Sequence, residues 1–391
     1  MYLGFYYHIP IRKDGDQLFT AGYLGCFLDA IAEQVGCLTL FMHSAEINDV
    51  DMDYALSSPN IKLVSLGEKP RPEVRTFLGN RIVAPAFKLL AECDVMLVRA
   101  PSHLFAAWGK LCDRQNVQMI PLLVGDYRAG NAGVRMPFPK KQAVQFLNWY
   151  VSWRERAYLR GKSVFVNSSI LAEKYRSIAR EVQEVRTTTL SATSFFERGD
   201  TCIGKTVNLL YAGRFDWQKG VQELVDAFMV LVKRQGVDAM LHFVGWQDGR
   251  GPSIEKAILK QVDEHGLSNR IVFHGKKAVG PELNAVYRMA DIYVLPSYAE
   301  GFPRTIWEAM ANSLPVIATK VGSIPDYLTD KTHALLIPPR DVGSLTSAIS
   351  CILNNMDLRV RLISEGRKLA ENNTLERQAE KIVNLLKEKV Q

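Results

Sequence analysis

Two glutamates in the second half of the chain are spaced to serve one ligand. They lie in the segment DIYVLPSYAEGFPRTIWEAMAN, which has the pattern of a buried strand, a tight turn with Glu300, and a helix with Glu308 in its second turn. A helix start presents backbone N–H groups and a positive dipole end, which favour an anion such as a diphosphate. The two carboxylates can accept hydrogen bonds from a sugar and a ribose. The alternative is structural: Glu300 caps the helix and Glu308 is a solvated surface residue.

A second segment, YAGRFDWQKG, brings two cations to the same end of a predicted sheet. It begins in the strand expected at 207–212 and continues into a loop with Arg214 and Lys219. Guanidinium and ammonium groups at this place can neutralise phosphates held by a neighbouring helix start. The alternative is an ordinary surface loop with basic residues. That alternative requires these cations and the two glutamates of the first segment to occur at the same end of the sheet by chance.

Alternating strands and helices are expected to position these residues. Short apolar runs alternate with segments of helical period along nearly the whole chain, which is typical of a parallel α/β architecture. In the first half we expect strands at 2–7, 37–43, 61–66, 94–98, 117–124 and 163–166. In the second half we expect strands at 207–212, 240–244, 271–274, 292–296, 316–319 and 334–337. Each set predicts a doubly wound parallel sheet that binds ligands at the carboxyl ends of its strands.

Chain length and a linker divide the chain into two domains. A chain of 391 residues exceeds what one hydrophobic core usually supports. Residues 187–205 are rich in Thr, Ser and Gly and show no periodicity, so we expect the linker there. We predict Rossmann-like domains over 1–195 and 196–391, with the last helix either in the second domain or packed back on the first.

The composition is typical of a globular protein of the cytoplasm. Apolar residues make up 47% of the chain and charged residues 23%. The six cysteines lack the paired spacing of a zinc site or a redox dithiol. No basic leader precedes an apolar run, and no window holds the roughly 18 apolar residues of a membrane span.

The residues of the two segments also resemble a known enzyme family. The resemblance rests on the two glutamates, with seven residues between them, and on two upstream pairs: Glu300, Glu308, Gly213-Arg214 and Lys219-Gly220. These features resemble the retaining glycosyltransferases of family 4, which have the GT-B fold of two Rossmann-like domains facing a cleft. The resemblance is strongest over 207–334 and weaker over the rest of the chain.

The resemblance implies a role for each of these residues. Arg214 and Lys219 would bind the diphosphate of the donor, Glu308 its ribose, and Glu300 the transferred sugar at the reacting centre. Backbone groups near 273–275 would contact the base. The remaining donor-binding residues implied for this half of the chain are Gly213, Gly245, Phe273, Gly275, Gly301, Phe302, Arg304 and Thr305.

The N-terminal half departs from the family pattern. Members usually carry a glycine-rich loop after the first strand, whereas the segment IPIRKDGD leaves only Gly15 for such a phosphate contact. Histidines often follow the later strands of the family. Here Asp126 matches in position and His103 lies nearby. We therefore add Gly15 to the donor-binding residues, and Asp126 and His103 to the catalytic ones beside Glu300.

The resemblance implies sugar transfer from a nucleoside diphosphate sugar to a glycan or lipid-linked acceptor. It implies retention of configuration, no bound metal and no other cofactor, and a setting in cell-surface polysaccharide, lipopolysaccharide or glycolipid assembly. One rival is a nucleotide-sugar epimerase of the same architecture. A nucleic-acid-binding module is the other, prompted by a net charge of +7, but the sequence has no recognisable nucleic-acid motif.

Two further features bear on metals and membranes. The acidic triplet Asp49, Asp51 and Asp53 could hold a divalent ion, but a solvated loop is the simpler interpretation. The segment 138–160 mixes aromatic and basic residues: Phe146, Trp149, Tyr150, Trp153, Lys140, Lys141, Arg154, Arg156 and Arg160. Such a face can meet an anionic membrane surface, which would place the protein at the inner face of the cell membrane. The alternative is that the aromatic residues pack into the core.

Overall fold

A computed structural model describes residues 1–45, 52–125, 138–247 and 253–390. The chain forms two compact units, Met1–Thr187 with Leu375–Gln391, and Thr188–Thr374. The boundary lies within the expected linker, eight residues before the predicted one at 195/196. No helix among the described residues is long and apolar enough to cross a membrane.

Unit 1 is built on a parallel sheet of seven strands in the order β10-β9-β8-β7-β1-β4-β6. The strands are β1 (Tyr2–Tyr6), β4 (Cys37–Ser44), β6 (Ile61–Glu68), β7 (Val95–Ala100), β8 (Gln118–Leu123), β9 (Ser163–Val166) and β10 (Glu181–Glu184). The inner strands are nearly continuous apolar runs because helices cover both faces of such a sheet. All six residues of β7 are buried, for example.

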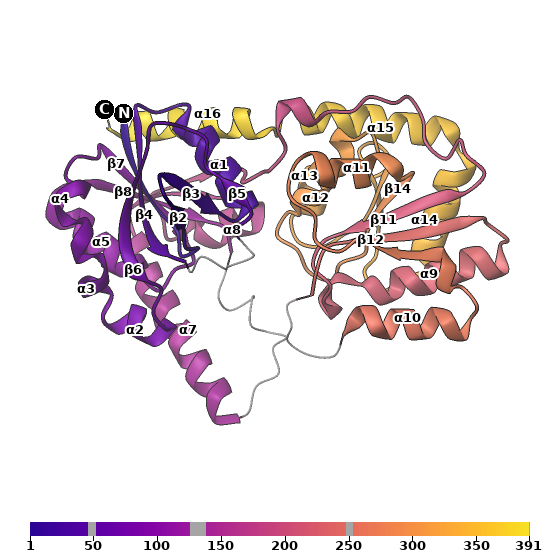
Figure 1. Ribbon diagram of the computed structural model, residues 1–391, viewed down its shortest axis with the longest axis horizontal. Helices are drawn as coiled ribbons and strands as arrows, with labels where there is room; N and C mark the ends of the chain where they lie inside the picture. The colour runs from indigo at the N-terminus through magenta and orange to yellow at the C-terminus, as the bar shows by residue number, and fades with distance from the viewer. Residues whose placement is uncertain (46–51, 126–137, 248–252, 391) are drawn as a thin grey trace. The chain divides into compact units, whose positions relative to one another are not determined.

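The helices of unit 1 include one that returns from the end of the chain. They are α1 (Gly22–Ala32), α2 (Pro72–Phe77), α3 (Gly79–Val83), α4 (Phe87–Leu90), α5 (Phe105–Gln115), α7 (Phe138–Leu159), α8 (Ser169–Arg176) and α16 (Leu375–Val390). Helix α16 packs on α1 (Figure 1) and buries Ile382 and Leu386 completely in the core of unit 1. A small antiparallel sheet, β2 (Arg12–Asp14), β3 (Gln17–Thr20) and β5 (Tyr54–Ala55), completes the unit.

Unit 2 repeats the architecture with six parallel strands in the order β13-β12-β11-β14-β15-β16. The strands are β11 (Val207–Ala212), β12 (Ala239–Val244), β13 (Ile271–Phe273), β14 (Ile292–Leu295), β15 (Val316–Thr319) and β16 (Leu335–Ile337). The helices are α9 (Val221–Arg234), α10 (Ile254–Glu264), α11 (Pro281–Met289), α12 (Arg304–Ala311), α13 (Ile324–Tyr327), α14 (Val342–Asn354) and α15 (Met356–Glu371).

The two parallel sheets confirm the predicted fold class. All twelve predicted strands are present, with ends that differ by at most two residues. The pattern missed β10 and the small antiparallel sheet. Strand β10, with the sequence EVQE, is a half-buried edge strand and therefore lacks the apolar run that marks an inner strand.

The strand orders identify one binding edge in each unit. In unit 1 the chain proceeds from β1 through β4 to β6 and then crosses to β7 on the other side of β1. In unit 2 the same reversal places β14 beside β11. Ligands of doubly wound sheets bind at the carboxyl ends of the strands where the order reverses. The residues after β11 and β14, and those after β1 and β7, are therefore the ones to inspect.

Candidate active site

Lys219 and Glu300 meet at the binding edge of unit 2. Lys219 ends a short 3₁₀ turn beyond β11, and Glu300 lies in the loop beyond β14. The Lys219 Nζ donates to Glu300 Oε1 over 2.6 Å, and Ser297 Oγ donates to the same oxygen over 2.7 Å. The side chains are only 18% and 10% exposed. Glu300 is therefore held by a cation, and no side chain caps α12, which excludes the capping alternative.

Glycines bring these loops into contact with each other. Gly220 and Gly322 have φ values of +63° and +59°, which favour glycine. A Cβ on Gly220 would lie 2.1 Å from the Pro296 carbonyl oxygen, and one on Gly322 would lie 1.9 Å from that of Glu300. The position of Glu300 thus depends on two backbone approaches that a larger residue would prevent.

The predicted glycines after β11, β12 and β13 form a ladder of backbone contacts. The N–H of Gly213 donates to Val244 O over 3.0 Å, and the N–H of Gly245 donates to Gly275 O over 3.0 Å. A Cβ on Gly245 would approach the Gly213 carbonyl oxygen to 1.9 Å. Phe273, at the end of β13, stacks on Phe243 with ring centroids 5.0 Å apart. These residues therefore follow one another along the carboxyl edge of the sheet, from β11 through β12 to β13.

Glu308 is held on both carboxylate oxygens. Tyr287 OH donates to Oε2 over 2.9 Å, and Thr189 Oγ1 donates to Oε1 over 2.6 Å. The side chain is half-buried, so the alternative of a solvated surface residue is wrong. Burial and the neighbouring Glu308 raise the pKa of Tyr287 well above its usual range, which keeps this phenol a donor.

The other predicted donor residues surround the start of α12. Thr305 Oγ1 accepts from Tyr293 OH over 2.6 Å, Phe302 stacks on Trp307 at 4.5 Å, and Gly301 O accepts from a backbone N–H over 3.0 Å. Arg304 is the first residue of α12. Arg214 is half-exposed, with a guanidinium nitrogen 3.9 Å from an Asp216 oxygen, so its side chain reaches solvent at this edge.

The three residues predicted in unit 1 have different outcomes. Gly15 lies in the turn between β2 and β3 with φ +58°, and the hairpin accounts for this glycine without a phosphate contact. Asp126 lies outside the described residues. His103 follows β7, and its Nδ1 is 2.9 Å from Thr76 Oγ1. Because that hydroxyl donates to the Pro72 carbonyl, it accepts from Nδ1–H, and the Nε2 of a neutral His103 is then an acceptor.

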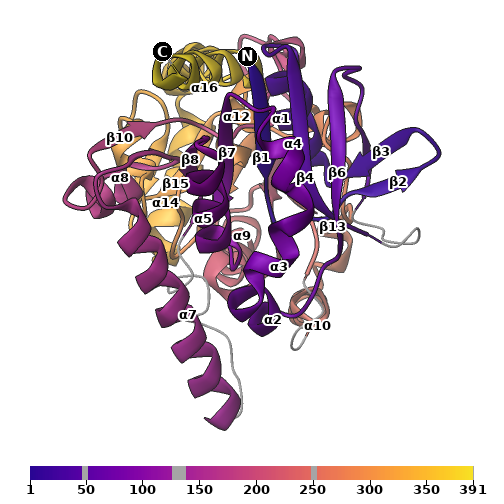
Figure 2. The same ribbon diagram turned by 90° about the vertical axis from the view of Figure 1, so that its left-hand side faces the viewer.

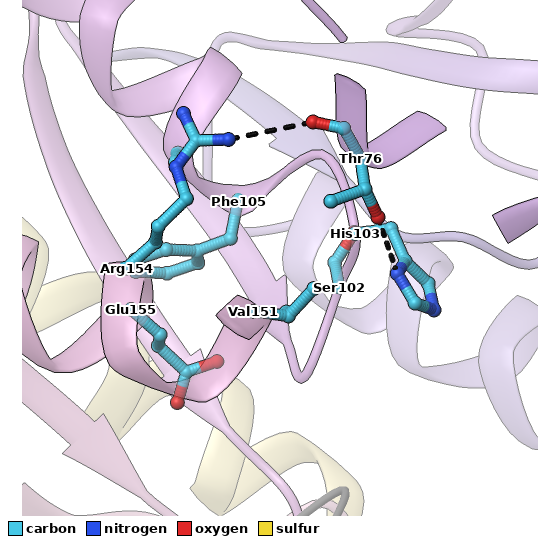
Figure 3. Close-up of a pocket in the computed structure, with 8 residues that line it drawn as sticks. Thr76, Ser102, His103, Phe105, Val151, Arg154 and Glu155 are labelled. Atoms are coloured by element: carbon cyan, nitrogen blue, oxygen red, sulfur yellow. Dashed lines mark hydrogen bonds between the residues drawn. The ribbon is translucent and has the colours of Figure 1, made fainter. Parts of the chain in front are cut away.

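A small pocket beside His103 is shown in Figure 3. Its lining includes Thr76, Ser102, Arg154 and Glu155, and its cavity volume is about 10 Å³. That volume holds about one water molecule, so the pocket is not an acceptor site in this conformation. Arg154 Nη1 donates to the Thr76 carbonyl over 3.4 Å and so ties α7 to α2.

The structure describes one residue of the acidic triplet and the helix that carries the aromatic segment. Asp49 and Asp51 lie outside the described residues, while Asp53 accepts from the Gly22 N–H over 2.8 Å and thus holds the start of α1. Among the described residues, no group of three potential metal ligands comes together. On α7, Trp149 and Trp153 are 49% and 56% exposed, so these side chains do not pack into the core.

Sequence reasoning missed several residues that hold the site. Ser297, Tyr287 and Thr189 each donate to one of the two glutamates. Ser297 lies three residues before Glu300, and a hydroxyl so close to a loop carboxylate was an available signal. Thr189 and Tyr287 are distant in sequence from Glu308, and only the fold brings them together.

The second half of the chain matches a known family model. Residues 198–369 match the family described as Glycosyl transferases group 1. This match and the GT-B-like fold support a glycosyltransferase. They give no support to an epimerase.

Individual proteins are similar to this chain over nearly its whole length. The chain is 24% identical to Protein CapJ of Staphylococcus aureus over 385 residues, which cover 96% of this chain and 92% of that protein. The structure of HepE from Anabaena in complex with UDP-glucose has a TM-score of 0.70 at 16% identity, covering 99% and 100% of the two chains. WaaG, a glycosyltransferase involved in lipopolysaccharide biosynthesis, has a TM-score of 0.67 at 15% identity, covering 98% and 99%. At these identities the two structures show a shared fold.

Proposed function

We propose that this chain transfers a sugar from a nucleoside diphosphate sugar to a glycan or lipid-linked acceptor, with retention of configuration. The observation that carries the proposal is the juxtaposition of Lys219, Glu300 and the start of α12 at the reversal point of the unit 2 sheet. That edge offers a cation and helix N–H groups to a diphosphate, and a carboxylate to a sugar. The complex of the similar HepE with UDP-glucose supports a sugar nucleotide as the donor.

Each residue has a distinct part in the proposed reaction. Lys219, Arg214 and the start of α12 stabilise the negative charge that develops on the leaving diphosphate. Glu300 accepts hydrogen bonds from the transferred sugar, and Glu308 accepts them from the ribose. No residue of the motif is an evident nucleophile. The acceptor oxygen therefore attacks the anomeric carbon from the face that the phosphate leaves, and its proton passes to that phosphate.

We propose cell-surface polysaccharide, lipopolysaccharide or glycolipid assembly as the setting. The similarity in fold to WaaG supports a lipopolysaccharide-type acceptor. A peripheral position at the inner face of the membrane is part of the proposal. Figure 2 shows α7 extending beyond the sheet of unit 1. The side chains of Phe146, Trp149 and Trp153 on this helix are exposed. Trp and Phe beside basic residues are typical of helices that lie in a membrane interface.

A binding and transfer assay tests the proposed function. UDP, GDP and ADP are screened first by thermal shift, because a ligand at 100 times its Kd adds about 2.7 kcal/mol of stability. The sugar nucleotide of the base that binds is then incubated with candidate acceptors, and the anomeric configuration of the product is read by NMR. Inversion would overturn the retaining mechanism. An epimerised sugar nucleotide in the absence of acceptor would favour the epimerase instead.

A variant pair connects the activity to Glu300. Glu300→Gln removes the charge beside the reacting sugar, so transfer should fall below a tenth of wild type while nucleotide affinity stays within about tenfold. Glu371→Gln removes the same charge from an exposed position on α15 and should leave both unchanged. Turnover of Glu300→Gln above a tenth of wild type would remove Glu300 from the catalytic residues. The same assay with and without a chelator tests the proposal that no metal takes part.

A further inference from the structure

A buried cluster of basic side chains occupies the reversal point of the unit 1 sheet. His8 follows β1, His43 lies in β4, and Arg75 reaches the same place from α2. Arg75 is only 6% exposed, and His43 is fully buried. This is the edge where a doubly wound sheet binds its ligand.

Among the described residues, Arg75 has no carboxylate partner of the kind that a buried cation requires. Its guanidinium lies near the Tyr6 phenol, and Tyr6 OH accepts from Ser102 Oγ over 3.3 Å. Within the part of the chain that the structure describes, the Arg75 Nε has no hydrogen-bond partner and no carboxylate forms an ion pair with Arg75. A guanidinium remains charged at every physiological pH, so burying it unpaired costs several kcal/mol. A bound anion would offset that cost.

Two buried histidines lie near Arg75. The Nδ1 of His8 and the Nε2 of His43 are buried without hydrogen-bond partners. Burial and the nearby charges of Lys69 and Arg75 lower the pKa of His8 to about 3 and, against a hydrogen bond to Gly67, that of His43 to about 4. Neutral at pH 7, the His8 ring can donate its one N–H to a ligand, whereas His43 donates its Nδ1–H to the Gly67 carbonyl oxygen over 3.4 Å and keeps Nε2 as an acceptor.

His103 completes the cluster at its more open side. Burial and Arg75 lower its pKa to about 4, opposed by the nearby carboxylate of Glu73 and reinforced by Lys69. Glu73 is exposed on α2, so it does not neutralise the buried Arg75. The net local charge of this edge is therefore positive.

We propose that this cluster binds an oxyanion, a phosphate or a carboxylate carried by the acceptor. Arg75 would hold it through its Nε–H and a terminal N–H, the paired geometry in which arginine recognises such groups. His8 would add a neutral donor. The oxyanion site stands on the structure of unit 1 alone, and only its assignment to the acceptor rests on the proposed function.

Binding of small oxyanions to the full chain tests the proposal. Glucose 1-phosphate, glucuronate and glucose are compared by thermal shift and calorimetry, which separates phosphate, carboxylate and neutral sugar. One of the two anions should bind, and glucose should not. Arg75→Gln should weaken that binding at least tenfold, while Arg81→Gln, on an exposed residue of the adjacent α3, should leave it unchanged.

Two controls separate a ligand site from a structural role. Removing an unpaired buried charge should leave the melting temperature of Arg75→Gln equal to or above that of wild type, whereas a structural arginine would lower it. Affinity for the nucleoside diphosphate should also be unchanged. A fall in nucleotide affinity would assign the site to the donor and overturn the proposal, as would the failure of both anions to bind. If transfer is never detected but an anion binds through Arg75, the proposed function fails and the oxyanion site stands.

Discussion

At the scale of single residues, the two basic residues of the candidate site in unit 2 lie in different surroundings. Lys219 is largely buried and pairs with Glu300, whereas Arg214 is half-exposed and has a long contact to Asp216. Exposed pairs contribute little to stability, and removal of one partner of a shielded pair costs more. The two basic residues should therefore respond differently to substitution.

Lys219→Ala and Arg214→Ala should each weaken nucleoside diphosphate binding by about 1.5–3 kcal/mol, the value of a charge-assisted contact. Only Lys219→Ala should also lower the melting temperature, because it leaves Glu300 without its cation. Calorimetry and thermal unfolding measure the two effects, with the exposed Lys233→Ala on α9 as the control. Unchanged nucleoside diphosphate affinity in both variants would show that the diphosphate does not bind at this edge.

At the scale of elements, loops after neighbouring strands are packed so closely that only glycine fits. Gly322 and Gly236 share a left-handed backbone, with φ values of +59° and +69°. They differ in surroundings, since a Cβ on Gly236 meets no atom within 4 Å, whereas one on Gly322 lies 1.9 Å from Glu300 O. Alanine at either position strains the backbone, but only alanine at Gly322 would also displace the loop that carries Glu300. Comparing the two variants therefore distinguishes the two effects.

Gly236→Ala should cost about 1–2 kcal/mol of stability, the penalty for a left-handed alanine, without any effect on transfer. Gly322→Ala should cost more and should reduce kcat/KM at least tenfold, because the loop that carries Glu300 must move. Urea unfolding and initial rates measure both. Equal rates in the two variants would show that the Glu300 position is not critical.

The exposed tryptophans of helix α7 give a second prediction at the scale of elements. Trp149→Gln with Trp153→Gln should reduce binding to phosphatidylglycerol vesicles at least tenfold, because the exposed rings would no longer enter the interface. Ile170→Gln replaces an equally exposed apolar residue, 48% exposed on α8, and serves as the control. Added salt should release the wild type, since the basic residues act within a Debye length of roughly 10 Å at 0.1 M salt. Equal vesicle binding by all three proteins would exclude this helix as the membrane contact.

At the scale of the whole molecule, buried histidines couple folding to pH. Burial lowers the pKa of His8 to about 3 and those of His43 and His103 to about 4, so these rings stay neutral in the folded chain. In the unfolded chain they take up protons as pH falls below about 6.5. Their contribution to stability is complete above that pH and decreases as pH falls towards 4.

The urea midpoint should therefore fall between pH 7 and pH 5, with each histidine contributing a slope that grows below pH 6.5 to at most about 1.4 kcal/mol per pH unit. His8→Asn should reduce the slope of stability against pH, whatever its effect at pH 7. A bound oxyanion should raise the pKa of the neighbouring histidines and so stabilise the chain more at pH 5 than at pH 7. Parallel profiles of stability against pH for wild type and His8→Asn would contradict the lowered pKa of His8.

The sequence alone determined the elements and the part of the site that is local along the chain. Buried parallel strands need continuous apolar runs, so all strands of the two parallel sheets except the edge strand β10 were predictable within two residues. Glu300, Glu308, Arg214 and Lys219 were predictable because each lies in or just beyond a loop that follows a recognisable strand.

Only the tertiary structure decided which side chains share an environment. The Lys219–Glu300 pair joins residues 81 positions apart, and Thr189 reaches Glu308 across 119. Arg75 gave no sequence signal, since a single arginine in a short helix is ordinarily solvated. Its burial beside His8 and His43 depends on the order in which β1, β4 and β7 pair, and contacts between distant segments of that kind leave no local period in the chain.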